Sequence, residues 1–453
     1  MKALSPTIRR RLLPLLVFVC TGVIVLMPLH AFLTVWAASV AGHYTVFRLW
    51  KELLLVLLVI GSGIIAWSLH SRPAAGRQWY RRWPLLTVTV AYLAVLGISG
   101  LISYLTGGVT AKAAGYGLLL DSRFLIFFLV VWLISHYGSW ISAHWRQIVL
   151  IPAVIVVIFG ILQYTVLPAD FLGHFGYGPA TIPAVQTVDQ KASYQRIQST
   201  LRGANPLGTY LIVVIAALGV LVLRGRKWRW LYAAGLALGL VALALTFSRS
   251  AWIGAAAALG WLIWEALRVH TGRRVLLIAG SAAVLACAAV GFSLRNNDVF
   301  QNIFFHTDEH SLSPTSSNQG HFNAARAGIT EIVRRPLGAG TGTAGPASVY
   351  NDHPARIAEN YYIQIGQEAG VIGLALFVAI NLLVAGRLWH RRGQLLPDVL
   401  LASLIGISLV NLLSHAWTDD TISYVWWGLA GAALALPATA PPQVSSKAGH
   451  AAQ

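Results

Sequence analysis

Three arginines have the position and chemistry to bind a phosphate group at a membrane surface: Arg249, Arg202 and Arg123. Arg249 lies in TFSRSAW, in a very short connection between two apolar runs, where an arginine usually faces a cavity or a partner because its charge is costly in lipid. Arg202 stands just before another apolar run, and Arg123 follows Asp121 at the end of a third. A planar guanidinium binds phosphate through two parallel hydrogen bonds, so we expect all three to contact a phosphate. Each also has a structural alternative. Arg249 could snorkel to the interface, Arg202 could be an ordinary loop arginine, and Arg123 could pair with Asp121.

His353 and Glu359 are the candidates for a general base that takes the proton from an attacking hydroxyl group. A histidine suits this role at neutral pH, whereas a glutamate needs burial to raise its pKa. Both stand in the polar stretch DHPARIAEN, where a solvated side chain is the alternative for each. Glu368, in QEAG at a membrane edge, is interpreted either as an acid or as a buried hydrogen-bonding anchor.

The remaining motifs do not indicate metal or nucleotide chemistry. HTDEH (306–310) places two histidines four residues apart, but the serines and proline that follow do not suit a helix, and no Asp-x-Asp pair is present. GAGTGTAG (338–345) lacks the Lys-Ser/Thr ending of a phosphate-binding P-loop, so we interpret it as a flexible turn. The sequence therefore predicts no metal site and no cofactor.

The elements that must position these residues are apolar helices. The chain of 453 residues is 57% hydrophobic and 11% charged, with a mean hydropathy of +0.66, which excludes a soluble globular protein. Long apolar runs recur along it, each able to cross a hydrocarbon layer of about 30 Å. We predict an all-α integral membrane protein with about twelve transmembrane helices and a large periplasmic loop that contains helices. The expected spans lie near 12–30, 53–69, 85–106, 117–135, 148–167, 207–223, 230–247, 251–267, 275–293, 370–388, 398–415 and 422–437.

Four segments follow from this pattern. Residues 1–293 hold nine spans and a first outward loop at 168–206. Residues 294–369 form the large catalytic loop, with a helix at 320–335. Residues 370–437 hold the last three spans, and residues 438–453 form a disordered cytoplasmic tail. The two outward loops are long, and long connections in compact domains are usually functional. Polar residues are concentrated in the second one, which indicates the site of chemistry.

The net charge of +18 is interpreted as a signal of topology rather than of nucleic-acid binding. Most of the 33 basic residues fall in alternate, short connections that contain very few acids. Excess Lys and Arg marks cytoplasmic loops and attracts anionic lipid headgroups. We therefore expect both termini in the cytoplasm, the long loops on the opposite side, membrane lipids as partners and no nucleic acid.

Three short motifs carry a resemblance to a known family. They are SRSAW around Arg249, PLGAGTG (336–342) after the outward helix, and ENYYIQIGQEAGVIGL (359–374) at the start of a span. In this order and membrane placement they resemble the O-antigen ligase and O-antigen polymerase superfamily of bacterial inner-membrane glycosyltransferases. The resemblance implies a GT-C-like fold, with the active site on the periplasmic side of the inner membrane.

The resemblance also implies a reaction and roles for residues. The donor is expected to be an undecaprenyl-pyrophosphate-linked glycan, and the acceptor lipid A–core for a ligase or a growing glycan for a polymerase. Transfer is expected to invert the anomeric centre without a metal or a nucleotide sugar. The family arginines that hold the pyrophosphate correspond to Arg249 and, less directly, to Arg202.

The chain also departs from the family pattern at two places. Glu359–Asn360 stands where the family has His-Asn, and His321 replaces an arginine ahead of the outward helix. The base therefore stays open between His353 and Glu359, with Asn360, Glu368 and His321 as supporting residues.

Two other functions are considered, a polymerase and a transporter, and the sequence argues against only the second. A polymerase would share the donor and differ only in the acceptor, so the sequence does not separate it from a ligase. A transporter or flippase would have charged or broken helices near mid-membrane and two symmetric halves. The polar residues here gather instead at one face and in one asymmetric loop. The sugar, the linkage, the oligomeric state and any motion of the loop are not specified by the sequence.

Overall fold

The structure is a computed structural model that describes residues 6–70, 84–188, 191–225, 227–269 and 317–435. The expected span at 275–293, the HTDEH motif and the tail at 438–453 lie outside the described residues. The described helices are α1 (Pro6–Leu26), α2 (His30–Ala41), α3 (Tyr44–Arg48), α4 (Trp50–His70), α6 (Pro84–Leu105), α7 (Ala111–Ser135), α8 (Trp140–Ala143), α9 (Trp145–Thr165), α10 (Ala204–Arg224), α11 (Arg229–Leu245), α12 (Arg249–Val269), α15 (Ser317–Arg334), α16 (Tyr361–His390), α17 (Leu395–Asn411) and α18 (Asp420–Ala435). Short 3₁₀ turns cover Met27–Leu29, Phe171–Phe175, Gly345–Tyr350 and Ala416–Thr418.

The described part of the chain is a helical membrane protein. Eight of its helical stretches are long and apolar enough to cross a membrane, and α11 and α17 are shorter apolar helices. The prediction of an all-α, multi-pass membrane protein is therefore confirmed at that level, while the number of twelve spans stays a prediction. The exception to the helical pattern is a small antiparallel hairpin of β1 (Gln186–Val188) and β2 (Lys191–Arg196) in the first outward loop.

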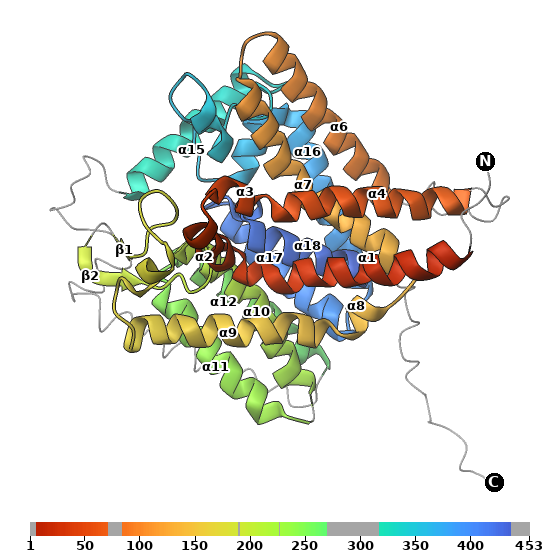
Figure 1. Ribbon diagram of the computed structural model, residues 1–453, viewed down its shortest axis with the longest axis vertical. Coiled ribbons are helices and arrows are strands. Elements are labelled where there is room, and N and C mark those ends of the chain that lie inside the picture. Colours follow the sequence, from red (N-terminus) through yellow and green to blue (C-terminus); the bar gives the residue numbers. More distant parts are fainter. Residues whose placement is uncertain (1–5, 71–83, 189–190, 226, 270–316, 436–453) are drawn as a thin grey trace.

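The best-buried helices form the centre of the bundle. α10 packs against α11, α12 and α17, and α18 packs along α7. Trp417, Trp426 and Trp427 are fully buried here, with Phe124 stacked on Trp417. Figure 1 shows α1, α4 and α9 side by side around this centre, with the hairpin, α2 and α3 gathered at one end of them. The packed centre thus fixes where the connections at that end lie.

The glycine-rich stretch 336–345 is packed rather than flexible, contrary to the interpretation from its composition. α16 bends at Gly370, which has a φ of 66°, and the stretch fits into this bend. Val371 N donates to Pro336 O at 2.8 Å, and Gly340 N donates to Glu368 O at 2.8 Å. A Cβ atom on Gly338 would lie 2.5 Å from Glu368 O and from Gly370 N, so the close approach requires glycine. The bend coincides with the expected start of the tenth span at residue 370.

Two buried carboxyl groups fasten this stretch to α7 and α16. Glu368 Oε1 accepts hydrogen bonds from Gly342 N at 2.9 Å and Ala344 N at 3.4 Å, and Asp121 Oδ1 accepts one from Tyr361 OH at 2.9 Å. Gln364 Nε2 also donates to Asp121 Oδ1 at 3.5 Å. Both side chains are fully buried, which makes this network a structural anchor.

Candidate active site

A cavity of about 1120 Å³ opens where the first outward loop, the α11–α12 turn, α15 and the ends of α16 and α17 meet. These segments are far apart in the sequence, and hydrogen bonds hold them at the same end of the bundle. Ile197 N donates to Leu245 O at 3.2 Å, and Thr200 Oγ1 donates to Pro28 O at 2.7 Å. Polar residues from the first outward loop, the α11–α12 turn and the ends of α16 and α17 line the cavity, which makes it the candidate active site.

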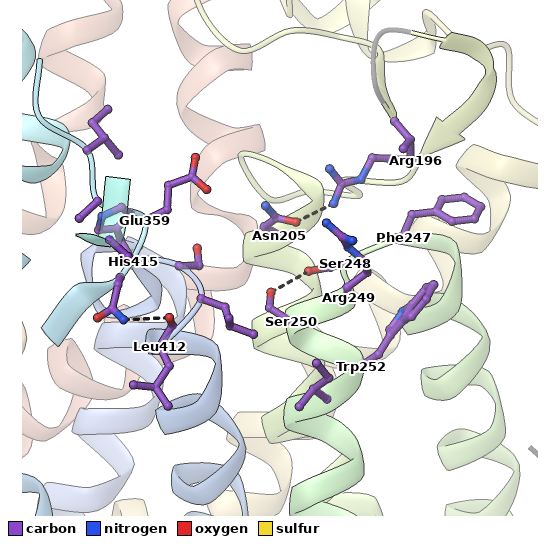
Figure 2. A pocket seen from close by; sticks show the side chains of 18 of the residues that line it. Arg196, Asn205, Phe247, Ser248, Arg249, Ser250, Trp252, Glu359, Leu412 and His415 are labelled. Atoms are coloured by element: carbon purple, nitrogen blue, oxygen red, sulfur yellow. Dashed lines mark hydrogen bonds between the residues drawn. The ribbon is translucent and has the colours of Figure 1, made fainter. Parts of the chain in front are cut away.

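One wall of the cavity carries two arginines, Arg196 and Arg249 (Figure 2). Arg196 ends β2, and its Nε donates to Thr246 O at 2.8 Å while its terminal nitrogen donates to Asn205 Oδ1 at 2.6 Å. Arg249 begins α12 directly after the turn 246–248, so the short connection predicted from the sequence places it at the cavity. Phe247 in that turn has a φ of 49°, a strained left-handed conformation for a bulky residue. Such strain is commonly found where a backbone must aim a functional side chain.

The opposite wall carries Glu359 and His415 (Figure 2). Glu359 also has a left-handed backbone, with a φ of 49°, and directly precedes the residue that caps α16. That residue, Asn360, accepts a hydrogen bond from Ile363 N at 3.0 Å and donates one to Leu412 O at 2.9 Å. Asn360 therefore joins the start of α16 to the segment after α17, and so sets the spacing between Glu359 and His415.

Apolar side chains complete the lining of the cavity. Trp252 and Ile253 come from α12, Phe322 from α15, and Leu412 and Leu413 from the end of α17. Ile253, Phe322, Leu412 and Leu413 are exposed in spite of their size. An arginine wall beside exposed apolar side chains suits a ligand that joins an anionic group to a hydrocarbon chain.

Arg202 lies outside the set of residues that line the cavity. Its Nε donates to Asp419 Oδ2 at 2.6 Å, across from the start of α18. Desolvation alone would lower the pKa of the Arg202 guanidinium, and the carboxylates of Asp419 and Asp420 raise it above its usual value. The structure therefore gives Arg202 a carboxylate partner and does not place it with Arg249.

Arg123 belongs to a buried group of charges that we call the ionic cluster, made of Lys51, Glu52, Arg123 and Asp420. Arg123 donates to Glu52 Oε1 at 3.1 Å, pairs with Asp420, and donates to Thr418 O at 2.8 Å. Lys51 Nζ lies 3.0 Å from Glu52 Oε1 and 3.4 Å from Asp420 Oδ2. Arg123 is 2% exposed, so its guanidinium is committed to protein acceptors and is not positioned for a ligand. The expected pair with Asp121 is replaced by these partners.

The other predicted residues lie at different places. His353 is not among the residues that line the cavity, and its Nδ1 lies 3.3 Å from Pro354 O. Glu368 lies in the buried network with Asp121, as the anchor interpretation had it. His321 is part of α15, but its side chain lies outside what the structure describes. The structure thus brings Arg249, Glu359 and Asn360 together from the predicted set.

Arg196 and His415 line the cavity but were not among the predicted residues. Arg196 stands six residues before Arg202 in the same outward loop, so the argument from membrane position applied to both. His415 is the last residue of the span expected at 398–415, where a histidine at a membrane edge was a usable signal.

The O-antigen ligase family model matches residues 234–378. This match, over about a third of the chain, supports the resemblance to the O-antigen ligase superfamily that the sequence motifs indicated. No curated protein matches the chain. The family covers O-antigen ligases and related polymerases, so the match supports a glycosyltransferase-like activity and does not distinguish a ligase from a polymerase.

The matched stretch supplies only part of the cavity. Arg249, Glu359 and Asn360 lie within it, as does α15. Arg196 and His415 come from segments before and after the match, respectively. The matched stretch and the segments that flank it therefore build the cavity together.

Proposed function

We propose that this member of the O-antigen ligase superfamily transfers a glycan from undecaprenyl pyrophosphate to lipid A–core at the periplasmic face of the inner membrane. One observation carries the proposal: Arg196 and Arg249 face Glu359 across a single cavity that is flanked by exposed apolar side chains. The donor has an anionic pyrophosphate, a long hydrocarbon chain and a sugar, and the cavity offers a surface that fits each.

The two arginines bind the pyrophosphate and stabilise it as it leaves. Charge develops on the oxygen that bridges the pyrophosphate and the sugar, and fixed positive groups at that point lower the barrier. Arg196 is held in place by Thr246 O and Asn205 Oδ1, so its guanidinium needs little reorganisation during the reaction. Ile253, Leu412 and Leu413 provide the apolar surface for the polyprenyl chain.

Glu359 acts as the general base on the acceptor hydroxyl. The acceptor oxygen forms a bond to the anomeric carbon while the bond from that carbon to the pyrophosphate oxygen breaks. The proton passes to Glu359, and undecaprenyl pyrophosphate leaves with the bonding electron pair. A single displacement of this kind inverts the anomeric centre. We prefer Glu359 to His353 because it lines the cavity opposite the arginines.

The charge pattern supports an assignment of the cavity to one side of the membrane. The connections that meet at the cavity end contain acids as well as arginines, whereas the alternate short connections contain Arg and Lys with very few acids, as is typical of cytoplasmic loops. We therefore assign the cavity to the periplasmic side and both termini to the cytoplasm.

Transfer by the purified chain tests the function. A polyprenyl-pyrophosphate glycan is incubated with lipid A–core, with a glycan of the repeat-unit type, or with neither. We expect glycosylated lipid A–core and release of polyprenyl pyrophosphate. If only the glycan acceptor is extended, the chain is an O-antigen or exopolysaccharide polymerase. If the lipid-linked glycan moves between leaflets with no new glycosidic bond, the chain is a flippase and the proposal fails.

A further inference from the structure

A second cavity, of about 550 Å³, lies on α15 outside the candidate active site. We call it the arginine groove. Four arginines line it, Arg326, Arg334, Arg335 and Arg356, together with one glutamate, Glu331. Glu331 binds Arg356 and accepts a hydrogen bond from Gln367 Nε2 at 2.9 Å, so this carboxylate already has two partners. The lining residues of the groove thus carry an excess of three positive charges, which suits a polyanionic ligand.

The faces of α15 explain how the groove is presented. Gly328 and Ile332 pack against Ile363 and Gly366 of α16, which fixes the inner face of the helix. Phe322, Ile329 and Val333 recur along the outer side and are 67%, 53% and 75% exposed. A helix with an exposed apolar strip beside arginines is typical of one that lies in the plane of a membrane interface. A helix of this kind would hold the groove at the level of lipid headgroups.

The size of the groove distinguishes two kinds of anion found among lipid headgroups, a single phospholipid phosphate and a larger phosphorylated sugar. A phospholipid phosphate occupies little of a 550 Å³ cavity, whereas ligand pockets that hold sugar-sized groups have about 300–1000 Å³. Arginine pairs with phosphate through two parallel hydrogen bonds, so several arginines in one hollow suit a headgroup with more than one phosphoryl or carboxylate group. The shape and charge together favour a phosphorylated sugar headgroup.

We propose that the arginine groove docks the phosphorylated sugar headgroup of the acceptor glycolipid. This inference rests on the proposed function, because it names the acceptor that the transferase takes. α15 separates the groove from the candidate active site, and Phe322 and Ala325 of the same helix line that site. A headgroup held in the groove therefore lies about one helix diameter, roughly 10–12 Å, from the cavity where Glu359 stands. An acceptor that extends a sugar chain past α15 brings its terminal hydroxyl to the base.

The test uses the full-length chain with Arg326→Gln, Arg334→Gln and Arg335→Gln combined. Arg356 is left in place because it binds Glu331. The matched control, Arg146→Gln with Lys227→Gln and Arg229→Gln, removes the same amount of charge from exposed positions at the other end of the helices. The acceptors are phosphorylated lipid A–core and the same glycolipid after phosphatase treatment.

For the groove variant we expect the KM for the phosphorylated acceptor to rise about tenfold, with kcat unchanged, because charge-assisted hydrogen bonds are lost. With the dephosphorylated acceptor, the groove variant, the control and the unaltered chain should behave alike. The same KM as the unaltered chain for the phosphorylated acceptor would overturn the proposal. So would an equal loss for both acceptors, because the arginines would then act through the fold or the donor.

A binding measurement separates this inference from the proposed function. Solubilised chain is titrated with phosphorylated lipid A–core, and then with vesicles of anionic phospholipid that contain no glycolipid. Weaker binding of the glycolipid by the groove variant supports the proposal even if no acceptor is glycosylated. Equal competition by the phospholipid vesicles would overturn it, because the groove would then bind the general membrane surface.

Discussion

The candidate active site and the ionic cluster both contain arginines, but the surroundings of the guanidinium groups differ. In the cluster they are enclosed, and in the candidate active site they line a cavity. In the cluster, Arg123 and Lys51 are 2% and 1% exposed and share the carboxylates of Glu52 and Asp420. In the candidate active site, Arg196 lines a cavity of about 1120 Å³, and its guanidinium donates to Thr246 O and Asn205 Oδ1. A place beside a cavity, in contrast to enclosure among buried carboxylates, therefore separates a candidate for ligand binding from a structural arginine.

The two regions also differ in what they contribute to the fold. The ionic cluster joins α4, α7 and α18, so its charges bind helices that are distant in sequence. The active site is built from strained connections, with left-handed backbones at Phe247 and Glu359, each costing about 1–3 kcal/mol. The bundle tolerates this strain because its centre is packed around the buried tryptophans. Substitutions in the two regions should consequently change different measurements.

The largest effect is expected for the general base. Glu359→Gln keeps the size and hydrogen-bonding ability of the side chain but removes its capacity to accept a proton. Transfer should fall about 10²–10⁴-fold, the usual contribution of general base catalysis, with thermal unfolding in detergent unchanged. His353→Gln is the control and should keep the original rate, because His353 does not line the cavity. The opposite outcome, with His353→Gln inactive and Glu359→Gln active, would move the base away from the cavity.

A smaller loss is expected for the arginine wall. Arg249→Ala should lower the transfer rate about 10²–10³-fold, because it removes a fixed positive group from the leaving pyrophosphate. Arg249→Lys keeps the charge but loses the paired hydrogen bonds, so a partial recovery should follow. The measurement is single-turnover release of polyprenyl pyrophosphate. Undiminished release by Arg249→Ala would show that the leaving group is stabilised elsewhere.

The ionic cluster should respond in stability instead of rate. Arg123→Ala leaves the buried carboxylates of Glu52 and Asp420 with less compensation, and the cost of breaking a buried ion pair is about 3–5 kcal/mol. Thermal unfolding in detergent should shift strongly, while the folded fraction keeps its transfer rate. Adding Asp420→Asn to Arg123→Gln should recover part of the loss, since both charges are then removed. A stable but inactive Arg123→Ala chain would instead make Arg123 a ligand contact.

The same contrast explains what the sequence could and could not specify. The apolar runs and the short SRSAW connection were sufficient to predict the helices and the position of Arg249, because both depend on local pattern. The partners of Arg123 and Arg202 were not predictable, since Asp420 and Asp419 come from more than two hundred residues away. The argument from membrane position covered Arg196 as well as Arg202, but which of the two lines the cavity depends on the register of the hairpin, which local composition does not determine.

The glycine-rich stretch 336–345 is a second case in which tertiary contacts were not predictable from local sequence. Its composition is that of a flexible turn, and local reasoning therefore predicted mobility. Its backbone nitrogens instead bind Glu368 and the bent part of α16, so tertiary contacts override the local tendency. A glycine that is required for close approach and one that allows flexibility are identical in sequence, and only the packing around Gly338 separates them.

The smallest effect is expected for Arg202. This arginine is the most sensitive test of the distinction between structural arginines and candidates for ligand binding. Arg202 is about half exposed, so its pair with Asp419 should contribute less than about 1 kcal/mol. Arg202→Ala should therefore leave both unfolding and transfer nearly unchanged. Asp419 loses little in this variant, because its Oδ1 also accepts hydrogen bonds from Thr421 N at 3.0 Å and Ile422 N at 3.4 Å, which cap α18.

Asp419→Ala provides the comparison from the other half of the same pair. It removes the cap as well as the ion pair, so it should cost about 0.5–2 kcal/mol and exceed the effect of Arg202→Ala. The two variants are compared by thermal unfolding and by transfer under identical conditions. If Arg202→Ala stops transfer as completely as Arg249→Ala while unfolding is unchanged, Arg202 contacts the donor in spite of its carboxylate partner. A place beside the cavity would then no longer separate functional from structural arginines in this protein.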